Sequence, residues 1–326
     1  MSAPTTATRR SVLKATGAAI AAAAVPATAA AADEEWTSVE SPTDSTLHDV
    51  ERVRGATADQ VSADAYAVGG SGVVLERSGG DGDWRKELDG GPGGNGNDLY
   101  GSDMTDDGKR LWFVGASGAI GEYDIRSGVL NDRSAPMDVT NNFNDVAVTG
   151  EAGDANVYVA GDSGKMYYSF ENGEEGSWDS VTPGSGSNVN AVDCFGAREG
   201  HIVDGNKTVF ETDDGSTWDK VGLADANENF YGVDSDGFGD VWVCGGGGMI
   251  HHWDGAEWTP ADTGDASLRD IEVEGDEGWT VGGGGAVYRY DGTWTETETP
   301  TGQNLNAVVR GGREIAVGAG GTIIEH

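Results

Sequence analysis

The chain has 326 residues, of which 54 are glycine and 10 are tryptophan. So many glycines without a triplet period, together with ample aromatic residues, exclude collagen and a disordered linker and favour many short strands joined by tight turns. The 56 acidic against 20 basic side chains give a net charge of −36, which disfavours nucleic acid and anionic lipid as partners and which we interpret as adaptation to molar salt rather than as an acidic ligand surface.

Residues 1–32 have the pattern of a signal peptide of the twin-arginine type. The pair Arg9–Arg10 and Lys14 precede an alanine-rich run that ends at Ala32. As a membrane anchor this run is too short and too weakly apolar, and no cysteine follows to carry a lipid. We therefore expect export by the twin-arginine route and cleavage before Asp33. The mature protein is then extracellular or associated with the cell surface and has no transmembrane segment.

A glycine-rich turn between two apolar strands recurs along residues 33–326. Successive copies start 36 to 46 residues apart. Self-similarity at this period is typical of repeat architectures such as propeller blades. The seven copies lie at 68–72, 114–118, 160–164, 203–207, 244–248, 281–285 and 317–321.

Two further markers accompany each turn. Each inner strand is marked by three residues: an apolar one, a variable one, and a small one or aspartate. The third residue is small because strands crowd together near a propeller axis. The seven inner markers begin at Leu47, Leu99, Phe143, Val189, Phe230, Leu268 and Leu305. Tryptophan opens many outer strands, at Trp84, Trp178, Trp218, Trp258 and Trp294. Each unit therefore has four strands, as a propeller blade does.

The two ends of the mature chain complete one unit. The seventh repeat stops at His326 after its third strand, and residues 35–39, with Trp36, have the pattern of an outer strand. Joining them in one blade closes the ring and removes exposed edges. We predict an all-β fold: a single seven-bladed β-propeller of four-stranded antiparallel blades over residues 33–326, closed by the N-terminal strand.

Residues 211–218 resemble the Asp-box, or BNR, repeat. Its Asp, Gly, Thr and Trp are matched by Asp213, Gly215, Thr217 and Trp218, and remnants occur at 254–258 and 291–294. The chain thereby resembles the BNR-like (WD/YVTN/BNR-like) propellers related to the photosystem II stability/assembly factor family. This resemblance implies a seven-bladed, non-catalytic protein that assists assembly of a complex. It also implies that the Asp-box is a structural turn between third and fourth strands, away from the binding face.

The residue after each inner-strand marker is expected to lie at the mouth of the propeller channel. We call these seven residues the collar: His48, Tyr100, Asn144, Asn190, Tyr231, Arg269 and Asn306. Hydrogen-bonding groups with one cation and two tyrosines suit a sugar, a peptide end or a small anion. The alternative is that these residues, asparagine above all, only satisfy turns and channel water.

Other chemistry finds less support in the sequence. A sialidase-like glycoside hydrolase needs an arginine cluster, yet Arg269 is alone in the collar, and the many carboxylates, most of which we treat as surface solvation, do not select a catalytic pair. His251 and His252 point to opposite faces of a strand and cannot chelate one ion together. We therefore assign no catalytic residue, no metal and no cofactor.

Two covalent features stay open. Cys194 and Cys244 fall on neighbouring blades, and export permits a disulfide between them, although two buried thiols suit the pattern as well. Asn206 begins a glycosylation sequon in an expected turn.

The functional hypothesis is an exported, non-catalytic and monomeric propeller that serves as a scaffold for a protein partner in high salt. A propeller that binds a small ligand or a glycan at the channel mouth is the alternative, and a glycoside hydrolase is a weaker one.

Overall fold

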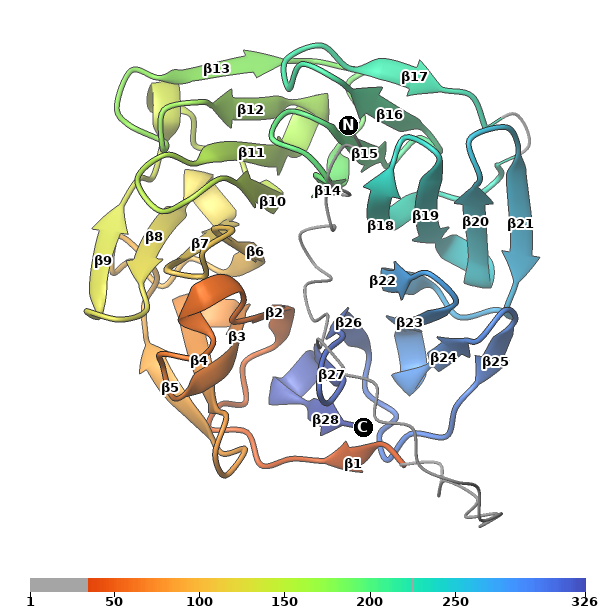
Figure 1. Ribbon diagram of the computed structural model, residues 1–326, viewed down its shortest axis with the longest axis horizontal. Coiled ribbons are helices and arrows are strands. Elements are labelled where there is room, and N and C mark those ends of the chain that lie inside the picture. Colours follow the sequence, from red (N-terminus) through yellow and green to blue (C-terminus); the bar gives the residue numbers. More distant parts are fainter. Residues whose placement is uncertain (1–34, 224–225) are drawn as a thin grey trace, which may run out of the picture.

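The computed structural model describes residues 35–223 and 226–326. They form seven four-stranded antiparallel sheets arranged in a ring around a common axis (Figure 1). The predicted all-β, seven-bladed propeller is confirmed. The predicted signal peptide lies outside the described residues.

Each blade runs from an inner strand at the axis to an outer strand at the rim. Blade 1 contains β2 Leu47–Arg52, β3 Ala63–Gly69, β4 Val73–Ser78 and β5 Trp84–Leu88. Blade 2 contains β6 Leu99–Met104, β7 Arg110–Gly115, β8 Ile120–Asp124 and β9 Val129–Asp132. Blade 3 contains β10 Phe143–Thr149, β11 Asn156–Gly161, β12 Met166–Ser169 and β13 Trp178–Val181. Blade 4 contains β14 Val189–Asp193, β15 Gly200–Asp204, β16 Val209–Thr212 and β17 Asp219–Val221. Blade 5 contains β18 Phe230–Gly237, β19 Asp240–Gly245, β20 Met249–Trp253 and β21 Trp258–Asp262. Blade 6 contains β22 Leu268–Glu274, β23 Glu277–Gly282, β24 Val287–Tyr290 and β25 Trp294–Glu296. Blade 7 contains β26 Leu305–Val309, β27 Ile315–Gly318, β28 Ile323–Glu325 and the N-terminal β1 Thr37–Ser38.

The ring closes as predicted, by pairing of the two chain ends. Thr37 and Ser38 of β1 lie opposite Glu325 and Ile324 of β28. The backbone N–H of Val39 adds a hydrogen bond to the carbonyl of Ile323 at 3.0 Å. β28 therefore has a hydrogen-bonded neighbour on both sides, β27 and β1, and offers no free edge to another molecule.

The hydrophobic core lies between the blades rather than within them. Because successive side chains of a strand point to opposite faces, Val157 and Val159 of β11 pack toward blade 2, while Tyr158 and Ala160 pack toward blade 4. Every junction between blades holds one such cluster of buried residues. The tryptophans at the outer strands belong to these clusters. Trp84 and Trp218 are buried in them, and Trp178, Trp258 and Trp294 are partly buried against them.

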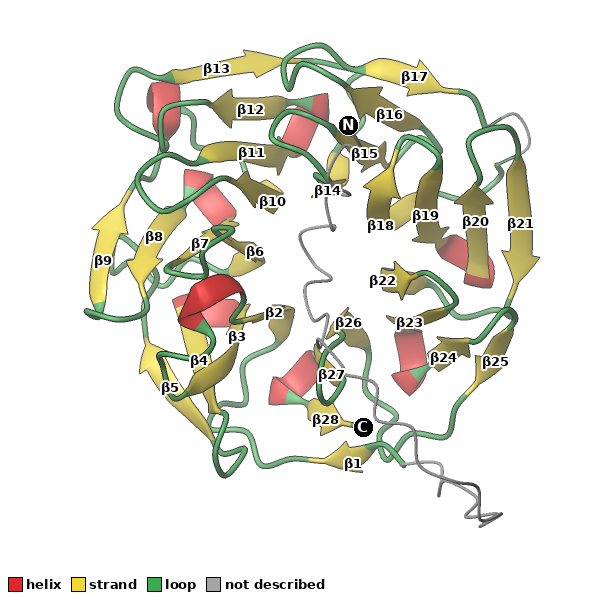
Figure 2. Cartoon of the chain, in the orientation of Figure 1, coloured by secondary structure: helices red, strands yellow, loops and turns green. Residues whose placement is uncertain are grey.

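Short 3-10 turns join second to third strands in all blades but the fourth (Figure 2). They are η2 Gly70–Gly72, η3 Ala116–Gly118, η5 Asp162–Gly164, η6 Gly246–Gly248, η7 Gly283–Gly285 and η8 Ala319–Gly321, and two others, η1 Gly55–Thr57 and η4 Pro136–Asp138, lie in other connections. Strand direction alternates within a blade, so these six turns and the starts of the inner strands share one face, which we call the mouth face. In the described part of the chain, no helix has the length and apolar character needed to cross a membrane.

Candidate binding site at the channel mouth

Each collar residue is the extra residue of a β-bulge. In every blade the pairing of the inner with the second strand shifts by one residue at this position, for example between Leu47 and Asp49 or between Phe230 and Gly232. A bulged residue lacks a partner in the ladder, and its side chain is re-aimed by the local bend. The repeated bulge explains why one residue per blade turns toward the channel mouth.

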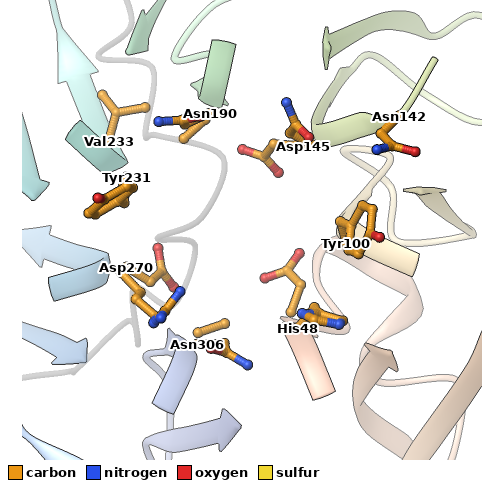
Figure 3. A pocket seen from close by; sticks show the side chains of 15 residues that line it. His48, Tyr100, Asn142, Asp145, Asn190, Tyr231, Val233, Asp270 and Asn306 are labelled. Atoms are coloured by element: carbon orange, nitrogen blue, oxygen red, sulfur yellow. The ribbon is translucent and has the colours of Figure 1, made fainter. Parts of the chain in front are cut away.

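The seven collar residues meet at one cavity of about 440 Å³ (Figure 3). Asp49, Asp145 and Asp270, each one residue further along its strand, also line it. Figure 3 shows Tyr100 and Tyr231 on opposite sides of the opening. The structure therefore brings the seven collar residues together at the channel mouth, where the repeats predict them.

The three collar asparagines join neighbouring blades. The side-chain amide of Asn144 donates to the carbonyl of Val189 at 2.9 Å, and that of Asn190 donates to Phe230 at 2.6 Å. Asn306 donates in the same way to Leu47 across the closing junction, at 2.7 Å. These three asparagines therefore serve the fold, but by linking inner strands of neighbouring blades rather than by satisfying turns or channel water.

Within the described part of the chain, the side chains of the other four collar residues make no hydrogen bond or ion pair. His48 and Tyr100 pack edge to face, with ring centroids 5.1 Å apart. Burial lowers the pKa of His48; Asp98 opposes this shift and Arg269 adds to it. Burial, together with Asp98 and Asp162, raises the pKa of Tyr100. At neutral pH His48 is therefore uncharged, and Arg269 is the cation of the collar.

Asparagine and aspartate in the outer-to-inner connections serve the neighbouring turns. The residue just before an inner strand accepts a hydrogen bond from the middle residue of the preceding blade's turn. Asp98 accepts from the Ser71 N–H at 2.7 Å, and Asn188 accepts from the Ser163 N–H at 2.9 Å. The asparagine-rich connections are thus part of the scaffold of the mouth face.

Six aspartates on the inner strands form links between blades that the sequence analysis missed. In each, a carboxylate oxygen accepts a hydrogen bond from a backbone N–H on the inner strand of the next blade, at 2.5 to 3.0 Å. The pairs are Asp49 with Ser102, Asp103 with Val148, Asp145 with Val192, Asp193 with Ser235, Asp234 with Val273 and Asp270 with Val308. Treating most carboxylates as surface solvation was wrong for these six.

A signal for these links is present in the repeats. The aspartate occupies the third position of the inner strand in blades 1, 3 and 6, and the fifth position in blades 2, 4 and 5. These two positions face the same side of a strand. In blade 2 the third residue of the inner strand is Gly101. This residue must be small, because an added Cβ would lie 2.6 Å from the carboxylate of Asp145.

The closing junction is held differently. Blade 7 has Ala307 and Val309 at the two positions. There the buried Glu325 of β28 receives Nε and Nη2 of Arg77 at 2.8 Å each, and the indole N–H of Trp84 at 3.1 Å. This charge-assisted contact joins the last strand of the ring to its first blade.

The Asp-box interpretation is not confirmed in its details. The segment does form the turn between β16 and β17, on the face opposite the mouth, and Trp218 is buried. The carboxylate that organises the turn is Asp214, which accepts the backbone N–H groups of Ser216 and Thr217 at 2.7 and 2.6 Å. Asp213, the residue matched to the motif, is exposed.

The remaining sequence-based sites are scattered. Cys194 and Cys244 are not joined by a disulfide, because each is buried in a different inter-blade cluster. Asn206 is exposed in the turn after β15, and the glycosylation of its sequon stays a prediction. His252 stacks on Trp242 while His251 packs beside Phe230. Among the described residues, no three histidine, cysteine or acidic side chains are grouped closely enough to hold a metal ion.

Comparison with solved structures places the chain among seven-bladed propellers. YCF48 from Cyanidioschyzon merolae aligns over 90% of this chain and 98% of its own with 17% identity and a TM-score of 0.70. YCF48 bound to D1 peptide aligns over 90% and 97%, with 14% identity and the same score. A catalytically inactive virginiamycin B lyase from Staphylococcus aureus with quinupristin aligns over 89% and 98%, with 12% identity and a TM-score of 0.74. No protein-family model and no curated protein matches the chain. At such low identities the likeness shows a shared fold, and function has to be argued from the site.

Proposed function

We propose that the protein is a non-enzymatic propeller that holds a protein partner on its mouth face. The observation that carries this proposal is the convergence of the bulged collar residues on one open cavity. In the described part of the chain, the side chains of His48, Tyr100, Tyr231 and Arg269 make no hydrogen bond to a neighbouring blade, so their polar groups are available for recognition. The likeness to YCF48, one structure of which has a D1 peptide bound, supports a protein ligand.

The exposure of Tyr231 supports the same proposal. Its side chain lines the cavity and is 37% exposed. Aromatic side chains are enriched at the cores of interaction sites. Phe238, which is 40% exposed, lies in the β18–β19 connection on the opposite face and offers a matched comparison.

The absence of catalysis is part of the proposal. The cavity carboxylates Asp49, Asp145 and Asp270 each accept a backbone hydrogen bond from the next blade. These carboxylates are therefore already engaged in the links between blades. Turnover of a glycan or sialoside substrate that is lost in collar variants would overturn this part.

The decisive experiment is affinity purification in high salt of the tagged mature protein and of two variants. Tyr100→Ala combined with Tyr231→Ala is expected to release a stoichiometric protein partner, because both aromatic walls of the cavity are removed. Phe238→Ala is expected to retain it.

A partner that remains on the double variant, or that Phe238→Ala releases instead, would contradict the proposed face. Glycan-array binding that depends on the two tyrosines would favour the alternative of a glycan-binding propeller. Circular dichroism establishes that each variant is folded.

We also propose export by the twin-arginine route and function at high salinity. The support is the pattern of residues 1–32 and the charge of the mature chain. N-terminal sequencing of the secreted protein tests the cleavage site, and a first residue other than Asp33 would relocate it.

A further inference from the structure

Negative charge dominates the cavity at the mouth. Three carboxylates line it, Asp49, Asp145 and Asp270, against the one guanidinium of Arg269. Two more carboxylates lie next to the collar: Asp98 is two residues before Tyr100, and Asp162 accepts the side-chain amide of Asn144 at 3.4 Å. A concave site lined by one sign of charge focuses its field and attracts ligands of the opposite sign.

These carboxylates are held in place before any ligand arrives. Asp145 and Asp270 each accept a backbone N–H of the next blade at 2.9 Å. Asp98 accepts the Ser71 N–H at 2.7 Å, and Asp162 accepts the side-chain amide of Asn188 at 2.8 Å. Pre-organised acceptors lose little freedom on binding, so more of the attraction appears as affinity.

Aromatic rings supply walls that also favour a cation. Tyr100 and Tyr231 flank the opening from opposite sides, and His48 packs against Tyr100 (Figure 3). The face of a tyrosine ring attracts an ammonium or guanidinium group. Arg269 is exposed at the opening of the cavity, where its single positive charge opposes the binding of a cation.

The arrangement suits an extended organic cation better than a metal ion. The carboxylates come from inner strands of different blades, and no three acidic, histidine or cysteine side chains in the described ranges cluster around one ion position. The cavity of about 440 Å³ is far larger than a bare ion requires. An alkyl chain that ends in several N–H donors would reach separate carboxylates while its stem lies between the tyrosines.

We propose that the cavity receives a basic side chain, lysine or arginine, from a segment of the protein partner. This inference rests on the proposed function, since it assumes a protein at the mouth face. Charge complementarity selects this occupant, because a segment with free basic residues is attracted to a strongly acidic protein and to this cavity above all.

The test uses three heptapeptides of glycine and serine, acetylated and amidated at their ends, with lysine, Nε-acetyllysine or glutamate in the middle. Binding to the mature protein is measured by calorimetry at millimolar peptide and constant KCl. The lysine peptide is expected to bind about tenfold more tightly than the acetyllysine peptide, because acetylation removes the charge that the carboxylates and rings attract.

Three variants test which charge the cavity prefers and whether the peptide binds at the mouth face. Arg269→Gln is expected to tighten binding of the lysine peptide severalfold, because it removes the one like charge of the collar. Tyr100→Ala combined with Tyr231→Ala is expected to weaken it, and Phe238→Ala on the opposite face to leave it unchanged. Preference for the glutamate peptide together with weaker binding by Arg269→Gln would show an anion site and overturn the inference.

Two further outcomes also overturn it: no detectable binding of the lysine peptide, and calorimetric binding of K⁺ without any difference among the peptides, which would indicate a site for inorganic cations. The proposed function fails separately. If the partner is released by the double tyrosine variant but the peptides are not distinguished, the mouth face binds a protein by other chemistry and only the inference fails.

Discussion

Single aspartates decide how tightly neighbouring blades are joined. Asp193 is 5% exposed, and its carboxylate accepts the backbone N–H of Ser235 on the next inner strand at 2.8 Å. Hydrogen bonds to an ionised group are stronger than neutral ones, and a buried N–H that loses its acceptor remains unsatisfied. The same side-chain type that contributes to the negative charge of the chain therefore also joins the inner strands at the centre of the ring.

We expect Asp193→Ala to lower the free energy of unfolding by about 2–4 kcal/mol, because the acceptor is lost and the Ser235 N–H stays buried. Asp193→Asn, which keeps a neutral acceptor, is expected to cost less. Urea denaturation at constant salt measures both.

The matched control is Asp213→Ala, which removes an exposed carboxylate and is expected to change stability by less than about 0.5 kcal/mol. Equal costs for the two alanine variants would show that the inter-blade link contributes nothing.

Among the elements, the glycine turns form the most regular feature of the mouth face. In η7, Gly284 and Gly285 have φ values of 70° and 81°. A Cβ on Gly285 would lie 2.1 Å from the carbonyl oxygen of Thr301, whereas one on Gly284 would meet nothing within 4 Å. The middle position is Ser71, Ser117 or Ser163 in three other blades, at similar φ. The last glycine is therefore required by a close backbone approach, and the middle one only by backbone preference.

Gly285→Ala is expected to destabilise the protein by about 3 kcal/mol or more, since it combines a left-handed conformation with a clash against fixed backbone. Gly284→Ala is expected to cost about 1 kcal/mol, because only the conformational preference is violated. Thermal unfolding of both variants checks the difference. A larger effect at Gly284 would contradict the assigned roles of the two positions.

The whole molecule combines a closed ring with an extreme charge. Residues 33–326 carry 17 basic and 56 acidic side chains, a net charge of −39. Repulsion among like charges opposes a compact state, and it acts over about 10 Å in 0.1 M salt but only about 3 Å in 1 M salt. Closure through β1 and the Arg77–Glu325 contact must hold the ring against this repulsion.

We therefore expect the unfolding temperature of a protein that comprises residues 33–326 to rise by about 10 °C or more between 0.1 and 2 M KCl, as repulsion is screened. Differential scanning calorimetry over a KCl series measures it. Sucrose at matched osmolality is the control, because it does not screen charge. An equal rise in sucrose, or none in KCl, would remove the support for a high-salt protein.

The repeats along the chain determine by themselves the number of blades, the closure by residues 35–39 and the seven collar positions. This is because blade geometry depends on local alternation and turn residues, which recur about every 40 residues. Only the tertiary structure separates Asn144, Asn190 and Asn306, which bridge blades, from Tyr231 and Arg269, which do not. It alone selects the six linking aspartates among 56 acidic residues and separates Cys194 from Cys244. These assignments depend on contacts between strands from different blades, whose side chains are brought together only when the bulged inner strands converge on the axis.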